Sequence, residues 1–197
     1  MTTRILLAGI LGGIVMFIWT SIAHMVLPLG KAGIREMDNE AAVLSALQTN
    51  LGENRGLYHF PGHGLGPNPT REQKSEAMKH MNEKLATNPS GLLMYNPPGR
   101  QVSLGRLLGT EFATEVLEAI LAVFLLAQTR LATFGARVGF VTVTGVLPAI
   151  ATNVSYWNWY GFPGVYTASY MFIQVVGFLC VGLVAALVLP KKKSADI

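Results

Sequence analysis

Three glutamates stand at helical spacing within an otherwise apolar stretch of the chain. Glu111, Glu115 and Glu118 all lie in the segment Leu104–Ala127. At about 100° of rotation per residue they fall within roughly 60° of one another, on one stripe of a helix. A carboxylate in hydrocarbon is energetically costly, so such a stripe faces a bundle interior, a partner chain or a water-filled cavity. Because three close carboxylates repel one another, we expect at least one of them to hold a proton.

A purely structural interpretation explains only part of this stripe. If the helix protrudes from the bilayer, Glu111 and Glu115 can lie in the outer interface. Glu118 cannot, because a span that begins beyond it would draw Gln128 and Arg130 into the hydrocarbon. Two interpretations therefore stay open: a stripe that binds a ligand or a partner, and a structural polar contact.

A second group of polar residues is expected at the depth of Glu111. His24 lies near the outer end of the first apolar stretch, and Asn153 and Tyr156 lie near the outer end of the third. Such a layer could form a ligand pocket, a proton path or a carboxylate–histidine metal site. More commonly, a lone histidine of this kind is a packed residue with one hydrogen-bond partner. No ligand-spacing motif supports a metal, so we assign no metal and no other cofactor.

The composition indicates a membrane protein. Of 197 residues, 51% are hydrophobic and only 13% are charged, whereas soluble domains carry about 25% charged residues. A disordered chain, a collagen-like rod and a disulfide-rich module are excluded, the last because Cys180 is the single cysteine. The net charge of +4 is spread along the chain and tied to the ends of apolar stretches, which argues against nucleic-acid binding.

Four stretches are long enough to cross a bilayer, which takes about 20 apolar residues. The predicted fold is mainly α: a four-helix transmembrane bundle with a small α/β extracytoplasmic cap between helices 1 and 2. The expected organisation is transmembrane helix 1 at 1–29, the cap at 30–102, helix 2 at 103–130, helix 3 at 131–157, an outer aromatic loop at 158–164, and helix 4 with a lysine-rich tail at 165–197.

A cleaved signal peptide is the rival interpretation of the first stretch. The sequence Ser21-Ile22-Ala23 resembles a cleavage site. The apolar stretch is longer than an ordinary signal-peptide core, so we keep it as a transmembrane helix.

The basic residues predict the orientation. Arg4, Arg130, Arg137 and the lysines 191–193 all fall on one side of an even number of spans, and that side is then the cytoplasm. The uncharged, aromatic connection 155–163 is typical of an outer interface. Both termini are therefore expected in the cytoplasm and the cap outside.

The cap is expected to contain two helices and two short strands. Asp38 or Asn39 can begin a helix that ends near 50. Thr70 followed by Gln73 matches a capping box and predicts a helix that ends near 87. The stretches 56–62 and 91–99 are short, apolar and closed by proline and glycine, and they predict two strands that could pair.

Pairs of small residues four apart recur along the apolar stretches. They permit close contact between helices, within one bundle or between chains. The pairs are Gly9–Gly13, Gly105–Gly109, Gly135–Gly139, Gly145–Ala149 and Gly182–Ala186.

Two segments resemble a family of small bacterial four-helix membrane proteins. They are 12–19, continuing through 24–30, and the entry to the second helix at 103–112. The family has no assigned activity. The resemblance implies a bacterial inner-membrane setting and four helices, and it transfers no catalytic residue.

The first functional hypothesis is a non-catalytic accessory or assembly subunit of a larger membrane complex. The chain lacks phosphate-binding, HExxH, CxxCH and GxSxG motifs, so no enzyme activity is assigned. We expect the bilayer and either a protein partner or a second copy of the chain as partners. One alternative is proton-linked transport of a small solute by an oligomer, with Glu115 and Glu118 carrying protons. Another is a quinone or metal site at the outer face, built from His24, Glu111, Asn153 and Tyr156.

Overall fold

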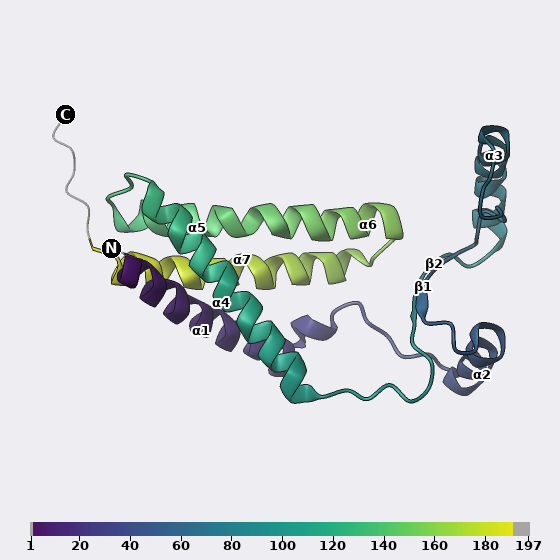
Figure 1. Ribbon diagram of the computed structural model, residues 1–197, viewed down its shortest axis with the longest axis horizontal. Helices are drawn as coiled ribbons and strands as arrows, with labels where there is room; N and C mark the ends of the chain where they lie inside the picture. Colours follow the sequence, from purple (N-terminus) through teal and green to yellow (C-terminus); the bar gives the residue numbers. More distant parts are fainter. Residues whose placement is uncertain (1, 191–197) are drawn as a thin grey trace. The chain divides into compact units, whose positions relative to one another are not determined.

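The computed structural model describes residues 2–190, and they are mainly helical (Figure 1). The chain divides into two compact units. One comprises Met1–Arg35 together with Ser103–Ile197, and the other comprises Glu36–Val102. The predicted lysine-rich end, at 191–193, lies outside the described residues.

The first unit contains the long helices. They are α1 (Thr2–Met25), α4 (Leu104–Gln128), α5 (Phe134–Ala149) and α7 (Gly164–Val188), with the short 3₁₀-helix η1 (Pro28–Lys31) after α1. A π-helical segment, η2 (Ile150–Val154), continues α5 into α6 (Ser155–Tyr160). The third helical region therefore runs past the expected end at 157, and the aromatic connection is shorter than the expected 158–164. The helix ends only at Gly161, which adopts the left-handed conformation (φ 70°) that favours glycine.

Three helices of the described chain are long and apolar enough to cross a membrane. They are Thr3–Met25, Phe134–Tyr160 and Gly164–Val188. Their outward side chains include Ile18 and Leu187, which are 53% and 75% exposed. Apolar residues on such surfaces are what a lipid environment requires. Helix α4 is not among the three because it carries three glutamates and Arg106, so a fourth spanning helix stays a prediction.

Glycines set the contact between α1 and α4. A Cβ atom placed on Gly13 would lie 2.5 Å from the Cα of Val116, and one on Gly9 would lie 2.7 Å from the Cα of Ile120. Only glycine lets the two backbones approach so closely. Because the numbering rises along α1 as it falls along α4, the two helices are antiparallel.

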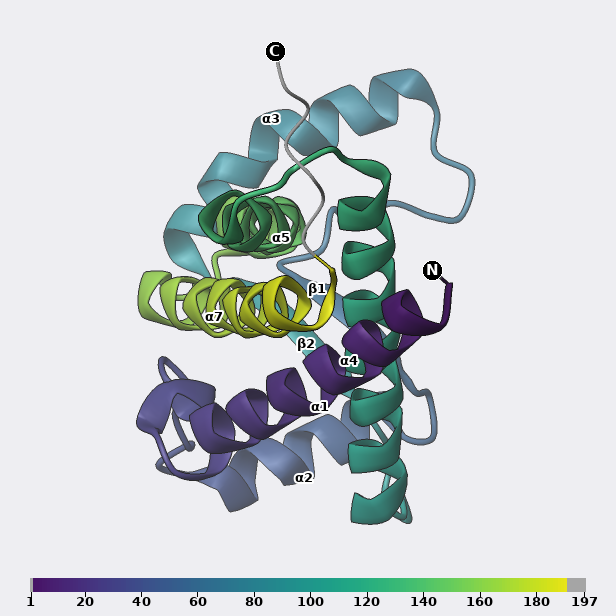
Figure 2. The same cartoon turned by 90° about the vertical axis from the view of Figure 1, so that its left-hand side faces the viewer.

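Helix α7 packs between α1 and α5 and is antiparallel to both. Because α7 is antiparallel to both, α1 and α5 run in the same direction. Figure 2 looks nearly along α5 and α7, with α1 and α4 beside them. The pairs that touch are Gly12–Val181 and Met16–Gly177 between α1 and α7, and Gly182–Val138 and Gly145–Phe178 between α5 and α7.

A densely packed, buried cluster lies toward the end of the unit where α1 begins and where α4 connects to α5. This buried cluster draws small and apolar residues from all four long helices, which permits dense packing. Its members are Ala8, Met16, Ala119, Ala122, Val123, Leu126, Val141, Phe178, Val181 and Ala185.

A buried arginine ties this end together. Arg137 is 3% exposed. Its Nε donates to the carbonyl oxygen of Leu131 at 3.1 Å, and its two terminal nitrogens donate to those of Leu189 (3.1 Å) and Pro190 (2.8 Å). The guanidinium thus joins the α4–α5 connection to the end of α7, where the helix dipole also favours a positive charge.

The second unit contains α2 (Glu40–Leu51), β1 (Gly56–Phe60), α3 (Arg71–Thr87) and β2 (Gly91–Tyr95). The strands pair antiparallel, with Gly56 opposite Tyr95, which confirms the predicted pairing. The capping box at Thr70 is also confirmed. Its Oγ1 accepts from the Gln73 N–H at 3.2 Å, while the Thr70 N–H donates to the Gln73 side chain at 2.9 Å.

An exposed histidine on α3 lies between two glutamates. His80 Nε2 is 3.1 Å from Glu76, and its Nδ1 is 3.1 Å from Glu83. These hydrogen bonds, the one to Glu83 first, raise the pKa of His80 above its ordinary value. The pKa of Glu76 is lowered, first by the hydrogen bond from Lys79 and then by the one from His80.

Candidate functional site

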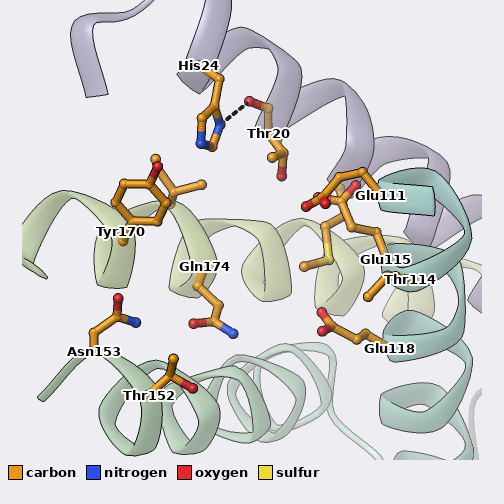
Figure 3. A pocket seen from close by; sticks show the side chains of 12 residues that line it. Thr20, His24, Glu111, Thr114, Glu115, Glu118, Thr152, Asn153, Tyr170 and Gln174 are labelled. Atoms are coloured by element: carbon orange, nitrogen blue, oxygen red, sulfur yellow. Dashed lines mark hydrogen bonds between the residues drawn. The ribbon is translucent and has the colours of Figure 1, made fainter. Parts of the chain in front are cut away.

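A cavity of about 270 Å³ lies within the first unit, beside the buried cluster (Figure 3). It brings together the three predicted glutamates with His24 and Asn153. Polar residues from α1, α4, η2 and α7 converge on it. The lining residues are Met16, Thr20, His24, Glu111, Thr114, Glu115, Glu118, Thr152, Asn153, Tyr170, Ile173 and Gln174.

Helix α4 supplies the acidic wall. Glu111, Thr114, Glu115 and Glu118 repeat at steps of three and four residues, so a single face of the helix presents them all. The contact of α1 with α4 at Val116 and Ile120 holds that face toward the cavity.

Glu115 is the buried member of the acidic wall. It is 4% exposed, and its Oε2 has no hydrogen-bond partner. The Thr20 side chain of α1 reaches the same carboxyl group. By contrast, Glu111 is exposed and Glu118 is half-buried. An unpaired buried carboxyl oxygen costs free energy until a proton or a cation satisfies it.

Helix α1 contributes a histidine whose hydrogen bonding is fixed. His24 Nδ1 lies 2.9 Å from the Thr20 carbonyl oxygen, which can only accept, so Nδ1 carries the hydrogen. In the neutral ring, Nε2 is then the acceptor. The ring packs edge-on against Tyr170 of α7, with centroids 5.7 Å apart.

The π-helical segment η2 supplies the opposite wall. It follows Pro148, whose missing N–H cannot support a regular helical hydrogen bond. Asn153 is buried there and its Nδ2 donates to the Ala149 carbonyl at 3.0 Å. Figure 3 shows its amide on the cavity side, facing the α7 residues Tyr170 and Gln174. Such wide turns inside α-helices are frequent at functional sites.

Sequence reasoning missed several of the polar lining residues. Thr20, Thr152 and Gln174 all contribute to the wall. Gln174 is the side-chain amide within the charge-free stretch of α7, and a polar group in such a span is a signal that could have identified it.

Tyr156 does not line the cavity, contrary to the expected layer. It is 43% exposed, because η2 delivers it to the outside of α6. Aromatic contacts connect it to the cavity instead. Its ring stacks on Phe162 at 5.3 Å, Phe162 lies 5.3 Å from Tyr166, and Tyr166 stacks on Tyr170 at 4.3 Å.

An apolar chamber of about 440 Å³ adjoins the acidic cavity. The two hollows share four lining residues: Thr20, His24, Glu111 and Tyr170. The residues that line only the apolar chamber are Phe17, Ser21, Met25, Leu104, Leu107 and Leu108.

The chemistry of the cavity suits a positive charge or a proton. Three carboxyl groups line it, and its lining residues include no lysine or arginine. Within residues 2–190, no group of three or more His, Cys, Asp or Glu side chains is arranged to hold a metal ion. The acidic wall therefore presents negative charge or protonatable groups to whatever enters the cavity.

Comparison with known proteins yields no matching family model, no matching curated protein and no matching solved structure.

Proposed function

We propose that this chain is an integral membrane protein that binds a small organic cation in the acidic cavity, in competition with protons, and carries it across the bilayer. The single observation behind this proposal is Glu115, a buried carboxyl group with an unpartnered oxygen in a cavity whose lining lacks lysine and arginine. A protein retains such a group where function requires it, since a structural site would pair it.

The groups that face Glu115 explain why cation and proton would compete. Glu111 and Glu118 come from its own helix, His24 comes from α1 and Tyr170 from α7, while η2 contributes only neutral amide and hydroxyl groups. Repulsion among the three carboxylates is relieved by protons or by a bound cation. Either occupant lowers the affinity for the other, which is the thermodynamic basis of proton-linked exchange.

The proposal includes α4 as a fourth membrane span. Helices α1 and α5 run in the same direction, so the chain must return to its starting side between them. Helix α4 is antiparallel to α1 and packs along it, which supports a crossing by this helix. Its glutamates then face the cavity rather than lipid, as a spanning helix requires.

We place the protein in a bacterial inner membrane with both termini in the cytoplasm and the cap outside. Arg4, Arg130 and Arg137 gather at the densely packed end of the bundle, and an excess of Arg and Lys marks the cytoplasmic side. The acidic cavity lies toward the opposite end, where the uncharged, aromatic α6 region suits the outer interface.

Calorimetry with tetramethylammonium tests the binding site. Titration of the purified protein in two buffers of different ionisation enthalpy should show binding accompanied by proton release. Glu115→Gln should abolish both, since it removes the charge and keeps the shape. Glu53→Gln, an exposed glutamate of the second unit, is the matched control and should bind normally. Equal binding by wild type and Glu115→Gln would refute the proposal.

Reconstitution tests the transport step. Liposomes that trap a pH-sensitive dye should report proton efflux when tetramethylammonium is added outside. Glu118→Gln and Glu115→Gln should both slow this exchange at least tenfold relative to Glu53→Gln. If the protein binds tetramethylammonium but does not exchange it for protons, the transport step is refuted and the protein is a receptor or sensor of the cation.

An accessory subunit of a membrane complex is the second candidate function. One face of α4 favours it: Cβ atoms placed on Gly105 or Gly109 would meet nothing within 4 Å, so this small-residue pair is open to a helix of another chain. Mass spectrometry of the intact assembly, extracted in mild detergent, distinguishes the candidates. A stoichiometric protein partner would support the accessory role, and a monomer or homo-oligomer would support the carrier.

A further inference from the structure

We infer that the ligand is an amphipathic amine, with its cationic nitrogen in the acidic cavity and its apolar group in the adjoining apolar chamber. This inference rests on the proposed function and specifies its ligand. It is carried by the arrangement of the two hollows, which have opposite chemistry and a common wall.

The common wall allows a single molecule to occupy both hollows. Thr20, His24, Glu111 and Tyr170 border each of them. A nitrogen held by Glu111 and Glu115 therefore lies next to the apolar chamber, and a substituent on that nitrogen can enter it. The chamber is the larger of the two, at about 440 Å³ against about 270 Å³.

The chamber exists because α1 and α4 separate beyond their close contact. The two backbones touch at Gly13, and the edge-to-face pair Phe17–Phe112, with centroids 5.4 Å apart, closes the space at that end. Beyond this pair, leucines of α4 face Ser21 and Met25 of α1 across the chamber. Leu104, at its border, is 67% exposed, so the chamber reaches the surface of the unit.

Other classes of ligand use this pair of hollows less well. A quinone is neutral, so it would leave the negative charge of the acidic wall unpaired. A bare metal ion or tetramethylammonium would leave the apolar chamber without an occupant. An alkylated ammonium matches both, because the charge pairs with the acidic wall and the chain buries apolar area against leucine and phenylalanine.

Two cations that share a head group test the inference. Tetramethylammonium and hexyltrimethylammonium differ by five methylenes, and each fully buried methylene strengthens binding by about fourfold. Burial of all five would give about 1,000-fold. Because the chamber border at Leu104 is 67% exposed, we expect burial of about two or three methylenes, so in nanodiscs of phosphatidylglycerol the hexyl compound should bind wild type about 10- to 100-fold more tightly than tetramethylammonium. Glu115→Gln should abolish binding of both.

Variants of the chamber separate this site from simple partition into lipid. Ser21→Phe fills the chamber and should reduce the hexyl advantage to about twofold, while the affinity for tetramethylammonium stays within twofold of wild type. Val143→Phe, which adds the same ring at a 60% exposed position of α5 outside both hollows, is the matched control and should keep the full advantage. Leu107→Gln, which places an amide in the same chamber, should also reduce the advantage of the hexyl compound. It tests the same point if the Ser21→Phe variant does not fold.

The outcomes distinguish the two proposals. If neither cation binds wild type, the proposed function fails. If the two cations bind wild type with equal affinity and Glu115→Gln abolishes the binding of both, the proposed function stands and the amphipathic ligand is refuted. A hexyl advantage that survives Ser21→Phe and Leu107→Gln also refutes it, since lipid would then be the source of the preference.

The lipid composition of the discs distinguishes a lipid amine from a free amine as the ligand. Two kinds of disc with the same membrane charge are compared, in which half of the phosphatidylglycerol is replaced either by phosphatidylethanolamine or by an uncharged glycolipid without an amine. If hexyltrimethylammonium binds more weakly in the discs with phosphatidylethanolamine, a lipid amine competes for the site. If the two affinities are equal, a free amphipathic amine is the ligand. Both results support an amphipathic amine.

Discussion

Replacing Gly13 with alanine probes the contact that holds α1 against α4. The added Cβ would lie 2.5 Å from Val116 Cα, 2.8 Å from its Cγ2 and 3.0 Å from its backbone nitrogen. Carbon atoms prefer separations of about 3.5–4.0 Å, so the two helices must move apart locally by about 1 Å. Two of the three atoms belong to the backbone, so a change of side-chain rotamer cannot relieve the overlap.

Two opposing free-energy terms set the expected magnitude. Overpacking of this kind lowers the free energy of unfolding by about 1–3 kcal/mol. Replacing a helix-interior glycine with alanine raises it by about 0.5–1 kcal/mol. Gly13→Ala should therefore lower the free energy of unfolding by about 1 kcal/mol. Gly139→Ala is the matched control, because a Cβ there meets nothing within 4 Å. It should raise the free energy of unfolding by about 0.5–1 kcal/mol.

Thermal unfolding followed by circular dichroism in one detergent measures the difference. A gap of about 2 kcal/mol corresponds to about 4–8 °C in Tm for a chain of this size. The second-site change Val116→Ala removes Cγ2 but leaves the two backbone atoms, so it should restore only part of the loss. If Gly13→Ala melts at or above the temperature of Gly139→Ala, the close helix contact is wrong.

Two further predictions concern charged groups outside the cavity. Arg137→Met should lower the free energy of unfolding by about 3 kcal/mol, because three carbonyl groups lose a charged donor. Denaturant titration in detergent measures the loss, and Arg137→Lys should recover part of the lost stability. An unchanged unfolding midpoint in Arg137→Met would contradict the prediction. The raised pKa of His80 means that its stabilising contribution is complete below the unfolded value near 6.5 and is lost as the pH rises through the folded pKa. An NMR titration of the full chain should place the His80 midpoint above 6.5 and Glu83→Gln should move it back, whereas a wild-type midpoint at or below 6.5 would contradict the ion pairs.

The sequence alone predicts two kinds of feature: long apolar helices, and helix ends that depend on a few neighbouring residues. The charge-free stretches of α1 and α7 have the length and composition of spanning helices by themselves, and the capping box at Thr70 depends on four consecutive residues. The glutamate stripe follows from helical spacing. Its juxtaposition with His24 follows from α4 being antiparallel to α1.

The rest depends on which helix faces which. Gly9–Gly13 and Gly135–Gly139 are the same motif, yet the first pair contacts α4 and the second faces open space. The motif specifies a small surface and not its neighbour. Pro148 predicts a disturbed helix. That the disturbance is a π-helical turn, which brings Asn153 to the cavity and leaves Tyr156 outside, results from packing against α7.

Two contacts leave helix α4 with a fixed part and a free end. Arg137 ties its connection to α5, and Gly13 and Gly9 of α1 hold it at Val116 and Ile120. The part from Val116 to Leu104 extends beyond both contacts, and at about 1.5 Å per residue it is an arm about 18 Å long. A rotation of about 5° at Val116 would displace the mouth of the chamber near Leu104 by about 1.6 Å, but would displace Glu115, beside the pivot, by only about 0.1 Å. Bending of this arm would therefore alter the entrance while the buried carboxyl group stays in place.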